Sequence, residues 1–154
     1  MEMLFQRFVM EYYRQHHKYM HPKAQRIDWN ITDGNSSDII KFLPSMQTDI
    51  TLKNGNKTLI LDTKYYGKIM AENYKSTYRS AHLYQIFSYV KNMDKDNTGN
   101  ISGLLLYAKT SENTLQDSGK IIIGNNPIGI KTLDLNGDFK EIAHQLDEII
   151  IEYL

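Results

Sequence analysis

The fold is decided by the stretch Met46-Gln-Thr-Asp-Ile-Thr-Leu-Lys-Asn-Gly-Asn-Lys-Thr-Leu-Ile-Leu-Asp-Thr-Lys64. Asn54-Gly55 is a strong two-residue turn signal, because both residues tolerate the positive φ that a type I′ turn requires. Before the turn, polar and apolar residues alternate. After it, Thr58-Leu-Ile-Leu61 is a short apolar run that is typical of a buried strand. The stretch therefore predicts a β-hairpin.

Three charged side chains are expected on one face of this hairpin. Asp62 and Lys64 are two residues apart on a strand, so they point the same way. A turn at Asn54-Gly55 places Asp49 diagonal to Asp62, roughly 7–8 Å away at the backbone. A turn at Gly55-Asn56 pairs the two aspartates directly. Both registers keep the shared face, whereas a three-residue loop without a bulge does not.

These residue types in this arrangement predict a metal-dependent site that cleaves phosphodiester bonds. Two carboxylates that reach inward from one hairpin face can hold one Mg²⁺, a cation that prefers oxygen ligands, and the carbonyl of Thr63 could supply another. A bound ion polarises the phosphate and helps to generate hydroxide. Lys64 can orient the water or offset charge on the phosphorus. The alternative is a solvated, inert Asp–Lys pair at a strand end.

Composition limits the possible functions. The 154 residues are 41% hydrophobic and 23% charged, with a formal net charge of +0, so a nucleic-acid surface must be a local patch or lie partly on a partner. The absence of cysteine excludes disulfides and thiolate zinc sites and fits a cytoplasmic protein. No stretch has the length of a membrane span, the layout of a signal peptide or a Walker-type phosphate loop. We expect one domain over residues 1–154.

The order of elements predicts an α/β fold in which helices flank a mixed β-sheet. Apolar spacing and turn signals predict three helices and two groups of strands. The helices are expected at 4–18, 77–93 and from Asp138, which forms a capping box with Glu141. The strands are expected at 25–31, in the hairpin, and at 103–109, 120–124 and 128–135.

The second predicted helix has a polar face as well as an apolar one. Gln85 and Tyr89 are four residues apart and share a face, with Tyr78 and His82 on the same side. This face could bracket Lys64 or contact a DNA phosphate. The alternative is an ordinary amphipathic helix whose polar face is solvated.

A basic segment follows the hairpin. Lys68, Lys75 and Arg79 are cations that can bind DNA phosphates, and tyrosines are interleaved with them. The alternative is a solvated loop. The histidines at 16, 17, 21 and 144 are expected at the surface.

Together these features resemble the PD-(D/E)xK nuclease superfamily and, within it, the nuclease domain of the McrC family, a subunit of McrBC-type 5-methylcytosine restriction systems. The resemblance implies a restriction-endonuclease-like fold, with an α-β-β-β-α-β core followed by C-terminal strands and a helix. Five blocks in family order carry the resemblance: Leu4-Phe-Gln-Arg-Phe-Val9, Met46-Gln-Thr-Asp-Ile50, Leu61-Asp-Thr-Lys-Tyr-Tyr66, Leu83-Tyr-Gln-Ile-Phe-Ser-Tyr-Val90 and Gly103-Leu-Leu-Leu-Tyr107.

The resemblance also implies roles for individual residues. Asp49 and Asp62 would bind Mg²⁺, for which Mn²⁺ should substitute, and Lys64 would be the catalytic lysine. Gln85 and Tyr89 resemble the Gln-x-x-x-Tyr motif of the RecB-like branch, which supports the catalytic site and touches DNA.

One position departs from the family pattern. Gln6 stands where the family usually has a glutamate, and its amide can ligate a metal through the carbonyl but brings no negative charge.

The resemblance implies DNA as substrate and an AAA+ GTPase of the McrB type as partner. The chain resembles the nuclease domain alone, and a homodimer is one way for such a domain to cut both strands. Two alternatives are a catalytically weak or inert DNA-binding or assembly module of the same fold, and another RecB-like nuclease.

Overall fold

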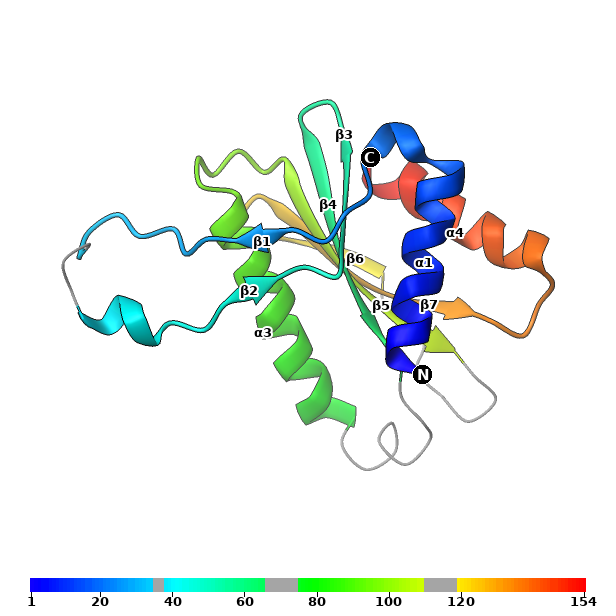
Figure 1. Cartoon of the computed structure of the whole chain (residues 1–154), viewed down its shortest axis with the longest axis horizontal. Coiled ribbons are helices and arrows are strands. Elements are labelled where there is room, and N and C mark those ends of the chain that lie inside the picture. The colour runs from blue at the N-terminus through cyan, green and yellow to red at the C-terminus, as the bar shows by residue number, and fades with distance from the viewer. Residues whose placement is uncertain (35–37, 66–74, 110–118) are drawn as a thin grey trace.

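The computed structural model describes residues 1–34, 38–65, 75–109 and 119–154, and it shows a five-stranded mixed sheet with three long helices packed against it (Figure 1). The predicted α/β class is confirmed. The long elements are α1 (Glu2–His16), β3 (Ile50–Asn54), β4 (Lys57–Lys64), α3 (Lys75–Met93), β5 (Ile101–Lys109), β6 (Gly119–Ile123), β7 (Asn126–Asp134) and α4 (Phe139–Tyr153). The short ones are η1 (Lys18–Met20), β1 (Arg26–Ile27), η2 (Asp38–Phe42) and β2 (Met46–Gln47).

The sheet has the strand order β3-β4-β5-β7-β6. Its three central strands, β4, β5 and β7, run parallel, and each outer strand is antiparallel to its neighbour. The carboxyl ends of β4 and β5 therefore meet at one edge of the sheet, where Lys64 lies beside Tyr107. The amino ends of β4 and β5 lie at the opposite edge of the sheet, next to the α3–β5 loop.

Helices cover both faces of the sheet (Figure 1). On one face, α1 and α4 pack on side chains such as Leu52, Leu61 and Leu106. On the other face, α3 packs on Ile60 and Leu105 together with the short β1–β2 ribbon. Successive residues of β4 thus point to opposite cores, as the pleat of a strand requires.

The hairpin turn lies at Gly55-Asn56, so the predicted turn at Asn54-Gly55 was wrong and the alternative register is correct. Gly55 has φ +62° and Asn56 is not among the residues with positive φ, which is the pattern of a type II′ turn. This register places Leu52 opposite Leu59, whereas the other register would place Leu52 opposite the exposed Lys57. Burial of the leucine pair explains the choice.

The predicted strand at 25–31 is much shorter in the structure. Only Arg26–Ile27 pair with a neighbouring strand, and their partners are Met46–Gln47. Pro44 precedes this partner segment and has no N–H to extend the ladder. Instead, the Trp29 indole N–H donates to the Pro44 carbonyl at 2.7 Å.

The predicted capping box of α4 is confirmed. The Asp138 side chain accepts from the Glu141 N–H at 2.9 Å, and the Glu141 side chain accepts from the Asp138 N–H at 3.2 Å. None of the helices in the described ranges combines the length and the apolar character needed to cross a membrane.

Candidate functional site

Asp49 lies where the hairpin register predicts it. The first ladder pair is Ile50 with Leu61, so extending the register by one residue sets Asp49 opposite Asp62. The Thr63 N–H donates to Asp49 Oδ2 at 2.8 Å, and the Thr63 hydroxyl donates to the same oxygen at 3.0 Å. These two bonds hold the Asp49 carboxylate against β4.

Asp62 and Lys64 face α3, where a chain of contacts begins. Lys64 Nζ lies 3.0 Å from Asp62 Oδ2 as an ion pair. The same ammonium donates to Gln85 Oε1 at 3.1 Å, and the Gln85 amide donates to the Tyr89 hydroxyl at 2.9 Å. The structure therefore brings together five residues that the sequence singled out, namely Asp49, Asp62, Lys64, Gln85 and Tyr89.

This chain of contacts is largely shielded from water. Asp62 is 3% exposed and Lys64 is 9% exposed. The pKa of Asp62 rises from 3.8 to about 7, mainly because the carboxyl is buried. The Lys64 ammonium lowers this pKa and the Asp49 carboxylate raises it. Burial also raises the pKa of the Tyr89 hydroxyl. Asp62 is therefore only partly ionised at neutral pH, because the charge of Lys64 does not fully offset the cost of burying the carboxylate.

His82 and Tyr107 form a second buried pair beside Lys64. His82 Nδ1 lies 2.7 Å from the Tyr107 hydroxyl, and Tyr107 is the parallel-strand neighbour of Lys64. Burial, followed by the charge of Lys64, lowers the pKa of His82 to about 4, so the imidazole is neutral at neutral pH. The sequence places His82 on the polar face of α3 but leaves open whether that face brackets Lys64 or is solvated. The spacing of His82, three and seven residues from Gln85 and Tyr89, is the signal that links all three to the same buried face.

The donor set at the hairpin fits a divalent cation of the magnesium type. Asp62 Oδ2 is buried, and the Lys64 ammonium lies 3.0 Å from it. The carboxylate oxygens of Asp49 and Asp62 are the ligand type that Mg²⁺ and Mn²⁺ prefer. The described ranges contain no cluster of three or more His, Asp or Glu side chains that could hold a metal, so this site offers two acidic side chains.

Residues 1–108 match the family described as McrBC 5-methylcytosine restriction system component. The chain belongs to this McrBC family. The predicted relationship to McrBC restriction systems is therefore confirmed.

Two similar proteins are longer than this chain. It is 30% identical over 155 residues to the type IV methyl-directed restriction enzyme EcoKMcrBC of Escherichia coli strain K12, spanning 100% of this chain and 43% of that protein. A solved Thermococcus gammatolerans half-complex of McrB AAA+ hexamers with bound McrC contains a similar fold, with a TM-score of 0.62 and 19% identity. That match covers 97% of this chain and 33% of the other.

Gln6, at the position where the sequence resemblance leads us to expect a glutamate, is half-buried on α1. With Asp49 it lines a cavity of about 210 Å³ between α1 and the hairpin. The structure therefore brings the amide to the same side of the sheet edge as one predicted metal ligand. Its ligation, like that of the Thr63 carbonyl, stays a prediction.

The predicted DNA contacts are only partly described. Lys68 lies outside the described residues. Lys75 and Arg79 belong to α3, but their side chains lie outside the described part of the chain. Tyr89 is 8% exposed, and its hydroxyl accepts a hydrogen bond from the Gln85 amide. Its contact with DNA stays a prediction.

The prediction that His17 lies at the surface was wrong. His17 Nε2 lies 2.7 Å from Asp147 Oδ1, and the Tyr12 hydroxyl donates to the same oxygen at 2.6 Å. The His17 side chain is 14% exposed. These contacts join the end of α1 to α4. Because Asp147 is 130 residues away in sequence, local spacing could not reveal its role.

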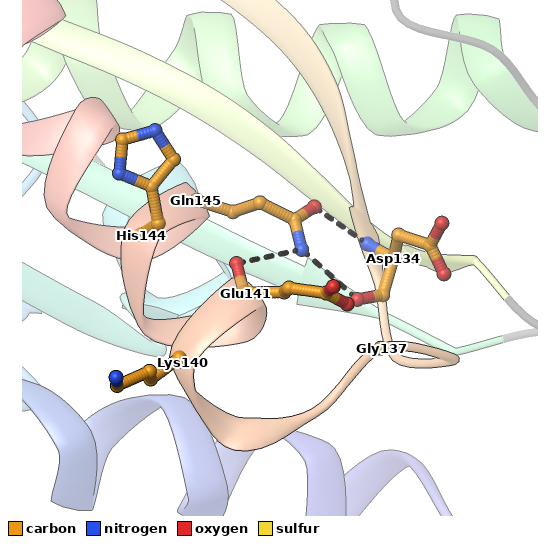
Figure 2. Close-up of a pocket in the computed structure, with 6 residues that line it drawn as sticks. All are labelled: Asp134, Gly137, Lys140, Glu141, His144 and Gln145. Carbon is orange, nitrogen blue, oxygen red and sulfur yellow. Dashed lines mark hydrogen bonds between the residues drawn. The ribbon is translucent and has the colours of Figure 1, made fainter.

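A larger surface cavity, of about 430 Å³, lies where β7 leads into α4 (Figure 2). Its polar atoms already bond to one another: the Gln145 amide bonds the backbone N–H of Asp134 and the carbonyls of Asp134 and Glu141. The His144 and Lys140 side chains extend away from these bonds. The contacts fasten α4 to β7 and suit a structural role.

Proposed function

We propose that this chain is a metal-dependent DNA endonuclease domain, the cleavage unit of a modified-cytosine restriction system. The observation that carries the proposal is the meeting of Asp49, Asp62 and Lys64 at one end of β4. Two acids and a cation at a shielded sheet edge suit hydrolysis of a phosphodiester. Membership of the McrBC family supports DNA as the substrate.

Asp49 and Asp62 would hold the metal ion, Mg²⁺ or Mn²⁺, with the Thr63 carbonyl and the Gln6 amide as further candidate ligands. When bound, the ion supplies Lewis acidity toward the phosphate and lowers the pKa of a coordinated water. The Thr63 N–H and hydroxyl keep Asp49 aimed toward the end of β4. Even beside the Lys64 ammonium the pKa of Asp62 is about 7, so a bound metal ion would favour the ionised carboxylate at neutral pH.

Lys64 would act on the reacting phosphate. Its ammonium can orient the attacking water and offset the charge that develops on the phosphate oxygens. Gln85 accepts from this ammonium and is itself bonded to Tyr89, so α3 fixes the position of Nζ. We therefore propose a catalytic role for Lys64 and a positioning role for Gln85 through Lys64.

The partners proposed for the whole protein follow from its relatives. The chain spans 43% of the E. coli relative, so further domains of such a protein would couple the nuclease to an AAA+ GTPase of the McrB type. The predicted cytoplasmic location agrees with this role. Pairing of two copies would supply the second site needed to cut both strands.

A nicking assay on supercoiled plasmid that carries 5-methylcytosine tests the proposal. Purified chain is incubated with Mg²⁺ or Mn²⁺, with and without an McrB-type subunit and GTP. Asp62→Asn should abolish nicking. Asp96→Asn should leave nicking unchanged, because Asp96 is exposed in the α3–β5 loop at the opposite edge of the sheet. Nicking by Asp62→Asn at the wild-type rate would refute the assignment.

One observation favours a second candidate, a non-catalytic DNA-binding or assembly module of the McrBC family. The described site has two acids, and Lys64 already pairs with one of them. Calorimetric titration with Mn²⁺ separates the candidates. Millimolar or tighter binding that disappears in Asp49→Asn argues for the nuclease, whereas no binding by the wild-type chain argues for the module.

A further inference from the structure

The cavity beside Asp49 has a chemistry that the metal site does not use. It lies along α1, and it is lined by Gln6, Arg7 and Arg14 on that helix and by Ala24 and Asp49 across from it. Arg7 and Arg14 are exposed and lie on the side of α1 away from the core positions Val9 and Tyr13, whereas the half-buried Gln6 lies next to those core positions. The volume of about 210 Å³ is several times the share of one water molecule, roughly 30 Å³, so a hydrated phosphate group fits.

One of the two arginines in this cavity, Arg7, is free to bind an anion. Arg14 pairs with Glu11 at 2.8 Å, so their charges offset each other. Arg7 is exposed, and no described side chain forms an ion pair or hydrogen bond with it. The guanidinium is a planar donor group that binds phosphate through two parallel hydrogen bonds. Arg7 therefore provides an unpaired phosphate donor next to the proposed metal site.

Gln6 adds to this donor set. Its amide offers two N–H donors, and unlike a carboxylate it does not repel a phosphate. Gln6 and Arg7 are neighbours on α1 and line the same cavity as Asp49. An amide at position 6 thus makes the cavity more favourable for an anion than an acid would.

We propose that Arg7 and Gln6 form a subsite for a DNA backbone phosphate flanking the one that is cleaved. This inference rests on the proposed nuclease function and extends it to the substrate contacts of α1. The subsite positions the strand and reads no base, because a phosphate contact carries no sequence information. A local cation of this kind would let a chain with a net charge of +0 bind DNA.

Fluorescence anisotropy with a labelled DNA duplex, in EDTA to prevent cleavage, tests the subsite. Arg7→Gln should weaken binding about 5- to 20-fold at moderate salt and reduce the slope of log K against log salt by about 1. Arg7→Lys should restore the slope and part of the affinity. Gln6→Glu should weaken binding through repulsion. Lys95→Gln is the matched control, because Lys95 is an exposed cation at the opposite edge of the sheet.

The outcomes separate the two proposals. A slope that stays at the wild-type value in Arg7→Gln overturns the subsite, and plasmid nicking that still depends on Asp62 leaves the nuclease proposal standing. A wild-type chain that neither binds duplex nor nicks plasmid overturns both. Equal losses in Arg7→Gln and Lys95→Gln also overturn the subsite, because the effect then depends on net charge alone.

Discussion

Gly103 controls how closely α3 approaches the sheet, so Gly103→Ala should disturb both stability and the candidate site. A Cβ at this position would lie 2.6 Å from Ile86 Cγ1 and 2.8 Å from Val90 Cγ2. Carbon atoms prefer separations of about 3.5–4.0 Å, so α3 must move by about 1 Å. Ile86 and Val90 are fully buried, which leaves little room for them to rotate away.

The expected cost follows from this clash. Overpacking a buried site costs about 1–3 kcal/mol, and replacing a strand glycine returns about 0.5–1 kcal/mol, so the net loss should be about 1–2 kcal/mol. For a chain of this length, that loss lowers Tm by about 2–8 °C. Thermal and urea denaturation followed by circular dichroism measure both quantities. The nicking rate should also fall, because a shifted α3 lengthens the 3.1 Å bond between Lys64 and Gln85.

A double-mutant cycle tests the reasoning behind this number. Ile86→Ala removes the atom nearest the new methyl group, so Gly103→Ala should cost at least about 0.5 kcal/mol less in that background. Two results would refute the account: a Gly103→Ala chain as stable as wild type, or the same cost in both backgrounds.

Two further predictions concern pH. Asp94 accepts from Thr98, Gly99 and Asn126, and its pKa falls to about 2: burial would raise the pKa, but these hydrogen bonds outweigh it. The stability that the Asp94 carboxylate contributes is present above about pH 4 and is lost as the pH falls toward 2. Asp94→Ala should therefore lower the unfolding free energy by about 1–2 kcal/mol at pH 7 and by less at pH 3. An equal loss at both pH values would contradict this prediction. The pKa of His82 is about 4, so the stability that its neutral form contributes is present above 6.5 and lost as the pH falls through 4. An NMR titration of its ring protons should show no midpoint near 6.5.

The hairpin could be predicted from sequence because its signals are local. The turn dipeptide, the alternation around Asp49 and the apolar run before Asp62 all lie within 19 residues. Two registers were compatible with these signals. The choice between them depended on pairing Leu52 with Leu59, which follows from burial.

The polar face of α3 could not be assigned in the same way. Periodicity shows that His82, Gln85 and Tyr89 share a face, but it does not show whether that face meets water or other polar groups. The structure places them over the sheet, where Gln85 bonds to Lys64 and His82 bonds to Tyr107. Buried polar groups require such partners, and these partners come from strands 18 or more residues away in sequence.

The central claim is that Asp49 and Asp62 bind one divalent cation. Crystals of the chain soaked in Mn²⁺ test it most directly through anomalous diffraction at the manganese edge. We expect one peak within coordination distance, about 2.0–2.6 Å, of both carboxylates, and no peak in crystals of Asp62→Asn. A Mn²⁺-soaked crystal with no peak at these carboxylates, or with its peak elsewhere, would contradict the account.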